Sequence, residues 1–206
     1  MMELVTNCTR RISRLACLVC IGVLLAALIP GCNLSPREPL PVFGTVEIPY
    51  TFTDQDGKPI NQKMLSGRIY VADFFFTTCP TICPIMKTQM LRIYEAYRDS
   101  DQLVLVSHSI DPEHDTVEAL HDYGSRLGIS AQRWHLVTGI KDEIYDTAKR
   151  YGLAALEDKN AAGGFIHSGS FSLVDRQGRI RGYYQGTDTH EVDTLIQDIR
   201  RLLDEG

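Results

Sequence analysis

Residues 69–84 read IYVADFFFTTCPTICP, and this stretch decides the fold. Its first part, residues 69–76, is almost continuously apolar, which is typical of a central β-strand buried on both faces. Residues 81–98 then carry apolar side chains at helical spacing, so a helix is expected directly after the strand. Cys79 and Cys83 therefore stand where a buried strand turns into a helix.

Strands and helices alternate along the rest of the chain. Further strands are expected at 46–53, 103–110, 134–138, 170–174 and 179–185, and further helices at 116–127, 142–151 and 191–203. This order indicates parallel strands covered by helices on both sides, with a last hairpin that adds an antiparallel edge. The sequence therefore predicts an α/β, thioredoxin-like fold with a central mixed β-sheet flanked by helices.

The N-terminal residues have the pattern of an export signal. Three arginines within residues 1–14 precede the uncharged run 15–29, which is about 15 residues long. A membrane-spanning helix needs ~20 apolar residues, so cleavage is favoured over permanent spanning. Residues 28–32, LIPGC, resemble a bacterial lipobox, in which the cysteine, here Cys32, becomes the acylated N-terminus.

This pattern predicts three segments. Residues 1–31 form a signal peptide of the lipoprotein type, residues 32–45 form a tether rich in proline, and residues 46–206 form the folded domain. We expect the domain on the extracytoplasmic (periplasmic) side, anchored to a membrane as a lipoprotein. An uncleaved anchor and simple secretion are the alternatives.

Charge argues against one class of partner. The formal net charge is −5, and the predicted signal contains three of the arginines, so the domain itself is more acidic. A nucleic-acid partner requires a basic face, so we expect none.

The six cysteines fall into two groups. Cys8, Cys17 and Cys20 lie in the predicted signal, and Cys32 is the predicted lipid acceptor. Only Cys79 and Cys83 remain in the domain, and a disulfide between them closes too small a loop to stabilise the fold much. The pair is therefore interpreted as redox-active or metal-binding, with an inert bridge or two buried thiols as the alternative.

The spacing of this pair suits both chemistries. The positive end of the expected helix favours thiolate over thiol. Side chains four positions apart in a first helical turn can face one another, so both sulfurs can bind one ion or close on each other. Two thiolates are soft donors and suit Cu(I) or Zn(II) better than Mg or Ca.

Three motifs carry a resemblance to a known family: FFFTTCPTICPIM at 74–86, SIDPEHDT at 109–116 and GFIHS at 164–168. Together they resemble the SCO/SenC family, synthesis of cytochrome c oxidase proteins, over about residues 46–204. The resemblance implies copper, as Cu(I) or Cu(II), bound by Cys79, Cys83 and His167, with an auxiliary contribution from Asp111. It also implies a thioredoxin-like metallochaperone that assists assembly of the dinuclear copper centre of cytochrome c oxidase.

The implied partners follow from that role. They are the copper-centre subunit of the oxidase, an upstream copper donor or thiol reductant, and the membrane that holds the lipid anchor. A metallochaperone binds and transfers rather than turns over, so the chain need not be an enzyme. The main alternatives are a thiol-disulfide oxidoreductase or peroxidase that uses Cys79 and Cys83 as a redox dithiol, and a copper or redox sensor.

Several residues have simpler interpretations. Without the family motif, His167 is only the best of six histidines, because it stands in a loop flanked by glycines. Asp111 precedes a proline and suits a turn. Asp115 suits the cap of the next helix, and Met86 and Met90 suit core packing.

Overall fold

The computed structural model describes residues 38–205. The predicted signal segment, residues 1–31, and the predicted lipid acceptor Cys32 lie outside the described residues. Among residues 38–205, no helix is both long enough and apolar enough to cross a bilayer. A compact unit begins at Leu40.

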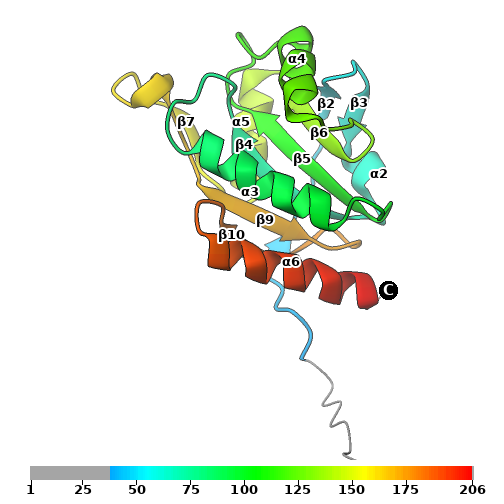
Figure 1. Cartoon of the computed structure of the whole chain (residues 1–206). Helices are drawn as coiled ribbons and strands as arrows, with labels where there is room; N and C mark the ends of the chain where they lie inside the picture. The colour runs from blue at the N-terminus through cyan, green and yellow to red at the C-terminus, as the bar shows by residue number, and fades with distance from the viewer. Residues whose placement is uncertain (1–37, 206) are drawn as a thin grey trace, which may run out of the picture. The chain divides into compact units, whose positions relative to one another are not determined.

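Eight strands form the main sheet, in the order β1-β10-β9-β4-β5-β6-β2-β3 (Figure 1). Their bounds are β1 Gly44–Thr45, β2 Thr51–Asp54, β3 Pro59–Asn61, β4 Ile69–Phe75, β5 Leu103–Ser109, β6 Trp134–Thr138, β9 Ser170–Val174 and β10 Arg179–Gln185. The neighbours β4, β5 and β6 pair in parallel, and the other pairs are antiparallel. The predicted mixed sheet with an antiparallel terminal hairpin is confirmed.

Helices cover both faces of this sheet (Figure 1). Their bounds are α2 Gln62–Leu65, α3 Cys83–Ala96, α4 Val117–Leu127, α5 Lys141–Arg150 and α6 Thr189–Asp204. Side chains alternate across a strand, so neighbouring residues of β4 meet different helices. Phe75 packs against Tyr123 of α4, and Phe74 packs against Tyr151, which directly follows α5. Every residue of β4 and β5 is consequently buried.

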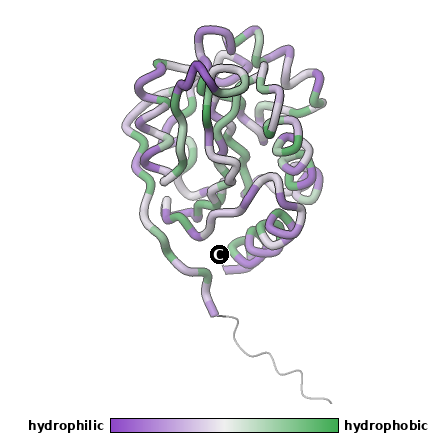
Figure 2. The backbone as a smooth tube through the Cα atoms, turned by 90° about the vertical axis from the view of Figure 1, so that its left-hand side faces the viewer, coloured by the Kyte–Doolittle hydropathy of each residue, from purple (hydrophilic) through white to green (hydrophobic). Residues whose placement is uncertain are grey.

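The distribution of hydropathy agrees with this layering. In Figure 2 the hydrophobic stretches of the tube run through the strands in the interior, and hydrophilic stretches lie mostly on the outer helices and loops. The largest fully buried side chain is Trp134 of β6. The continuous apolar run that predicted a central strand therefore corresponds to the centre of the core.

One predicted strand is wrong. Residues 46–53 do not form a single strand, because the chain passes from β1 at one edge of the sheet to β2 near the other. Pro49 lies in this crossing, and a proline has no backbone N–H to donate to a strand ladder. Four short strands were not predicted: β1, which has two residues, and β3, β7 and β8, which have three residues each.

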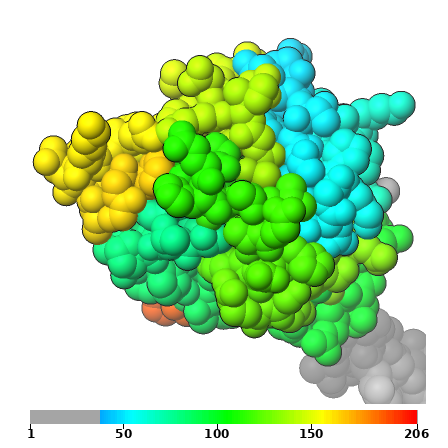
Figure 3. Space-filling view, turned by 90° about the horizontal axis from the view of Figure 1, so that it is seen from above, coloured from blue at the N-terminus to red at the C-terminus, as the bar shows by residue number. Residues whose placement is uncertain are grey.

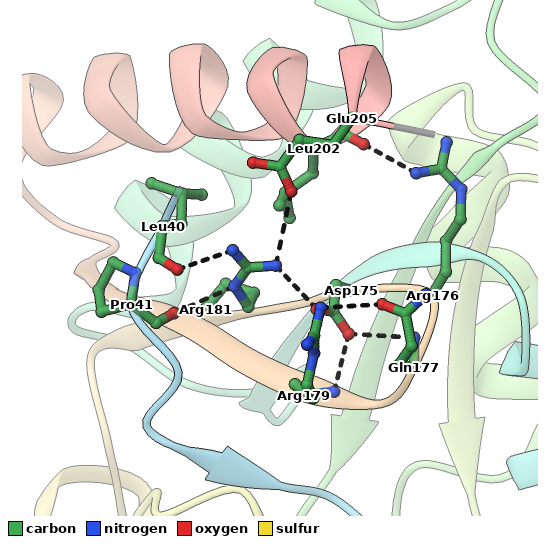
Figure 4. A network of polar contacts seen from close by, with 9 residues as sticks. All are labelled: Leu40, Pro41, Asp175, Arg176, Gln177, Arg179, Arg181, Leu202 and Glu205. Carbon is green, nitrogen blue, oxygen red and sulfur yellow. Dashed lines mark hydrogen bonds and ion pairs between the residues drawn. The ribbon is translucent and has the colours of Figure 1, made fainter. Parts of the chain in front are cut away.

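A buried arginine fixes the start of the folded unit (Figure 4). The side chain of Arg181 on β10 is 3% exposed and donates hydrogen bonds to the backbone oxygens of Leu40 and Pro41, at 2.7 and 3.1 Å. Its guanidinium also forms an ion pair with Asp175 at 2.9 Å. The first residues of the unit are therefore bonded to the sheet through one side chain.

Candidate metal centre

The two cysteines occupy different local structures. Strand β4 ends at Phe75, and helix α3 begins at Cys83, slightly later than the sequence predicted. Pro84 takes the first turn of the helix, where a missing N–H costs nothing. Cys79 consequently lies in the loop of residues 76–82 that connects strand and helix, and Cys83 lies in the first helical turn.

A buried carboxylate holds this loop in place. Asp115 is fully buried and accepts hydrogen bonds from the backbone N–H of Thr77, at 3.1 Å, and from its hydroxyl group. The prediction that Asp115 caps the following helix is wrong, because Thr116 is the N-cap and accepts from the amide of Ala119. The positioning role of Asp115 was missed because its partner lies 38 positions away in the sequence.

His167 reaches the site on a projecting hairpin. This segment, called here the histidine arm, comprises β7 (Ala155–Glu157), the 3-10 turn η1 (Ala162–Gly164) and β8 (Phe165–His167). The two strands pair antiparallel, with Ala155 opposite His167. In Figure 3 the arm, in yellow, projects from the rest of the domain and lies against the teal segment around residue 80. Hairpin pairing thus sets the position of the His167 ring.

Cys79, Cys83 and His167 come together as a buried cluster. Their sulfur and ring nitrogen atoms all lie within 4.8 Å of one another, and both cysteines are free thiols. Sγ of Cys83 is 3.0 Å from Nε2 of His167. Among residues 38–205, these three side chains form the one group of three or more His, Cys, Asp or Glu residues whose ligand atoms are close enough to hold a metal ion.

The backbone selects the useful tautomer of His167. Its Nδ1 lies 3.0 Å from the carbonyl oxygen of Ser168, which can only accept a hydrogen bond. Nδ1 therefore carries the proton, and the lone pair of Nε2 points to the cysteines. Burial lowers the pKa of His167 below its usual value, so the ring is neutral at neutral pH. A neutral imidazole oriented in this way is ready to bind a metal.

The two thiols differ in acidity. Burial alone would raise the pKa of Cys79, but a hydrogen bond from the Cys83 thiol and bonds from the amides of Thr81 and Cys83 lower it below the usual value. Burial and the Cys79 interaction raise the pKa of Cys83. Cys79 is thus the better thiolate and the better nucleophile, as expected for a cysteine beside a helix start.

A small cavity opens onto these groups. Its volume is about 220 Å³, and its walls come from the loop and from the histidine arm. The lining residues are Phe76, Cys79, Thr81, Ile82, Ala161, Ala162, Phe165, Ile166 and His167. An ion or a small donor group can therefore approach Cys79 and His167 from one side, through mostly apolar walls.

The structure does not bring Asp111 into the cluster. Its carboxylate accepts a hydrogen bond from Nδ1 of His114 at 2.9 Å, and its backbone oxygen accepts from the amides of His114 and Asp115. These are the contacts of a turn residue after β5. Met86 and Met90 are buried in the core, as their helical spacing predicted.

Three solved structures resemble the fold of this chain. A SCO1/SenC family lipoprotein from Bacillus anthracis str. Ames is 31% identical with a TM-score of 0.72, and the match covers 81% of this chain and 98% of that one. BsSco, described as a member of the Sco family of cytochrome c oxidase assembly proteins, is 29% identical with a TM-score of 0.69, covering 79% and 96%. Bradyrhizobium japonicum ScoI with copper bound is 26% identical with a TM-score of 0.64, covering 76% and 99%.

A family model supports the same relationship. The model described as SCO1/SenC matches residues 42–204, which include the loop, the histidine arm and all three residues of the cluster. The chain therefore belongs to the SCO1/SenC family.

Proposed function

We propose that this chain is a copper metallochaperone that assists assembly of the dinuclear copper centre of cytochrome c oxidase. The observation that carries the proposal is the cluster of two thiols and one imidazole within 4.8 Å of one another. Copper is the cargo of such a protein, held by Cys79, Cys83 and His167 and then passed on.

The donor set suits copper in both oxidation states. Thiolates are soft ligands that hold Cu(I), and an imidazole nitrogen suits Cu(I) and Cu(II). Three protein ligands leave a position open for an incoming ligand from a partner. Copper is bound in the relative from Bradyrhizobium japonicum, which supports the assignment of the same cargo here.

The same cysteines can gate release of the ion. When an oxidant, such as the disulfide of another protein, accepts two electrons from the two thiolates, their sulfurs join in a disulfide and the oxidant is reduced to two thiolates. The two thiolates of Cys79 and Cys83 are then no longer available to the metal. We therefore expect the reduced chain to bind copper more tightly than the oxidised chain. Equal affinity of the two forms in a copper titration would exclude the gate.

The oxidase subunit that holds the dinuclear centre is the proposed recipient. Support comes from BsSco, which is described as belonging to a family of cytochrome c oxidase assembly proteins. An upstream copper donor or a thiol reductant would act on the same cluster before transfer.

The proposed location is the extracytoplasmic face of a membrane, with Cys32 as the lipid acceptor. The uncharged run 15–29 and the lipobox-like residues 28–32 support this location. The relative from Bacillus anthracis is described as a lipoprotein, which also supports it.

A test in cells shows whether copper delivery to the oxidase depends on His167 or is disturbed by any histidine substitution. The gene is removed and replaced by the wild-type chain, by His167→Ala or by His190→Ala, whose ring is exposed on α6. We expect the wild-type and His190→Ala chains to restore the copper content of the oxidase and the His167→Ala chain to fail. Full restoration by His167→Ala would overturn the proposal.

A second candidate is a thiol-disulfide oxidoreductase, which the lowered pKa of Cys79 favours. The two functions respond differently to one substitution. A dithiol reductase should tolerate His167→Ala, because the thiols remain, whereas copper binding requires the ring. Disulfide reduction by His167→Ala at the wild-type rate, together with full oxidase assembly, would favour the reductase.

A further inference from the structure

A buried lysine lies next to the copper-binding cluster. Lys87 follows Cys83 by four positions on α3, so the two side chains share one face of the helix about one turn apart. The Lys87 side chain is only 3% exposed, which is unusual for a lysine. Neither the fold nor the set of metal ligands requires a charge at this position.

The Lys87 ammonium is held by side chains of two neighbouring strands of the sheet, β4 and β5. Its Nζ lies 3.5 Å from the carboxylate of Asp73 on β4, 3.2 Å from the hydroxyl of Ser107 on β5 and 3.7 Å from the centre of the Phe75 ring. Ser107 donates to Asp73 and accepts from the indole N–H of Trp134 on β6, at 2.9 Å. The ion pair is therefore fixed in a polar network between α3 and the sheet.

Stability does not explain this pair. Desolvating two charges costs several kcal/mol each, and apolar residues of similar volume usually stabilise a core as well or better. The rings of Phe75 and Trp134 lie beside the ammonium, at 3.7 and 5.4 Å from Nζ to the ring centres, so much of its surroundings is apolar. A buried lysine at this position therefore calls for a role other than packing.

Helical geometry places the charge of Lys87 near the cluster. Cys83 and Lys87 are four positions apart on α3 and both are buried, so their side chains lie about one helical turn apart on the covered face of the helix. A unit charge in a buried site is screened much less than in water, so it acts over such a distance. The ammonium favours added negative charge on the cluster, and the carboxylate of Asp73, with which it is paired, opposes this effect.

We propose that Lys87 is a positioning residue for Cu(I): its buried ammonium stabilises the anionic complex of copper with two thiolates, and Asp73 fixes the ammonium and partly offsets its charge. Two thiolates, a neutral imidazole and Cu(I) carry a net charge of −1, whereas the Cu(II) complex is neutral. Lys87 consequently favours Cu(I) over Cu(II). This inference rests on the proposed copper function.

The test uses substitutions that break the same ion pair from its two ends. Lys87→Met and Lys87→Gln remove the positive charge, Asp73→Asn removes the negative charge, and a Lys87→Met/Asp73→Asn variant removes both. Cu(I) and Cu(II) affinities of the full chain in detergent are measured by competition with chelators. A Cys79→Ser/Cys83→Ser variant gives the copper bound by the other cysteines, which is subtracted.

If the charges act electrostatically, removing the lysine and removing the aspartate change the Cu(I) affinity in opposite directions. We expect Lys87→Met and Lys87→Gln to weaken Cu(I) binding about tenfold and to affect Cu(II) binding less, as for one unit charge at short range in a buried site. Asp73→Asn should strengthen Cu(I) binding, and the double variant should return toward the wild type. Arg92→Met is the matched control, because it removes a partly exposed positive charge from the same helix and should leave affinity unchanged.

Other outcomes overturn the inference. A merely structural pair predicts that Lys87→Met and Asp73→Asn weaken binding in the same direction, and unchanged affinities exclude any electrostatic role. Each variant is first checked for a cooperative unfolding transition. If one of the two lysine variants does not fold, the Cu(I) affinity of the other lysine variant is used, together with the direction in which Asp73→Asn changes the Cu(I) affinity. A wild-type chain that binds no more copper than Cys79→Ser/Cys83→Ser would overturn the proposed function as well, whereas wild-type binding with unshifted variants would overturn only the role of Lys87.

Discussion

Nε2 of His167 lies 3.0 Å from Sγ of Cys83, although 84 positions separate the two residues in the sequence. Pairing of β7 with β8 sets the position of the ring, and the carbonyl of Ser168 sets its tautomer. Cys83 is fixed by the first turn of α3. The ligands of the proposed copper site are therefore arranged by the fold before any ion binds.

The difference in acidity between the thiols predicts a difference in reactivity. Because the pKa of Cys79 is lowered and that of Cys83 is raised, Cys79 carries more thiolate at neutral pH. Brief alkylation of the reduced chain, followed by peptide mass spectrometry, should modify Cys79 before Cys83. Cys83→Ser should leave the product at Cys79. Faster labelling of Cys83 in the wild type would contradict the assignment.

The turn of the histidine arm predicts a strong effect of one glycine. Gly163 has φ of +80°, and an added Cβ would lie 2.8 Å from the ring of Phe76, which contacts the His167 ring at 6.0 Å between centroids. Gly163→Ala should therefore displace these rings and weaken copper binding, besides the ~1–3 kcal/mol of backbone strain.

Gly164 supplies the matched control for this effect. Its φ is +84°, but an added Cβ would meet nothing within 4 Å. Gly164→Ala should show a similar backbone strain in urea unfolding with a smaller loss of copper affinity. Equal losses of copper affinity in the two variants would show that contact with Phe76 does not position the ring.

His108 predicts a dependence of stability on pH. It is fully buried among Phe74, Phe52 and Tyr151, and burial lowers its pKa from 6.5 to about 4. Between these values the unfolded chain binds a proton that the folded chain does not, so stability falls as the pH falls through this range. The loss at pH 5 is ~2 kcal/mol relative to neutral pH.

Urea unfolding at pH 7.5 and pH 5 tests this contribution. In His108→Phe, which keeps a ring in the same aromatic environment, the loss of stability on acidification should be about 2 kcal/mol smaller. His190→Ala removes an exposed ring and should keep the wild-type dependence. An identical pH dependence in His108→Phe would disprove the assignment.

The contacts of Arg181 predict its effect on stability. Arg181→Met leaves the buried Asp175 with fewer partners and removes the donors to two backbone oxygens, so we expect a loss of about 3 kcal/mol. Arg179 pairs with the same carboxylate, but its side chain is 41% exposed, and Arg179→Met should cost less than ~1 kcal/mol. Fluorescence of the single Trp134 during urea unfolding measures both. An equal decrease in the free energy of unfolding in Arg181→Met and Arg179→Met would show that the burial of Arg181 does not increase its contribution to stability.

The sequence predicts the centre of the fold better than its edges. Residues 69–76 form a long apolar run and residues 81–98 show helical spacing, and both signals are local, so β4 and α3 follow from them. The strands β7 and β8 have three residues each and depend on contact with the rest of the domain, so no local pattern predicts them. For this reason His167 could be assigned only through the family motif.

The roles of the buried polar residues could not be predicted from the sequence either. Asp115 bonds to Thr77, and Lys87 pairs with Asp73, over distances of 38 and 14 positions in the sequence. Sequence periodicity shows only that Lys87 and Cys83 share one face of the helix. This face is buried, and a buried helix face is an unusual place for a lysine. The partners that make these residues important are brought together only by the sheet.

The most direct test of the account is the copper content of the reduced full chain, combined with its optical spectrum after oxidation of the metal to Cu(II). We expect one more copper per wild-type chain than in Cys79→Ser/Cys83→Ser, and a sulfur-to-copper charge-transfer band that is lost in Cys79→Ala and altered in His167→Ala. Equal copper in the wild type and Cys79→Ser/Cys83→Ser, with no such band, would contradict the central claim that these three side chains form one copper site.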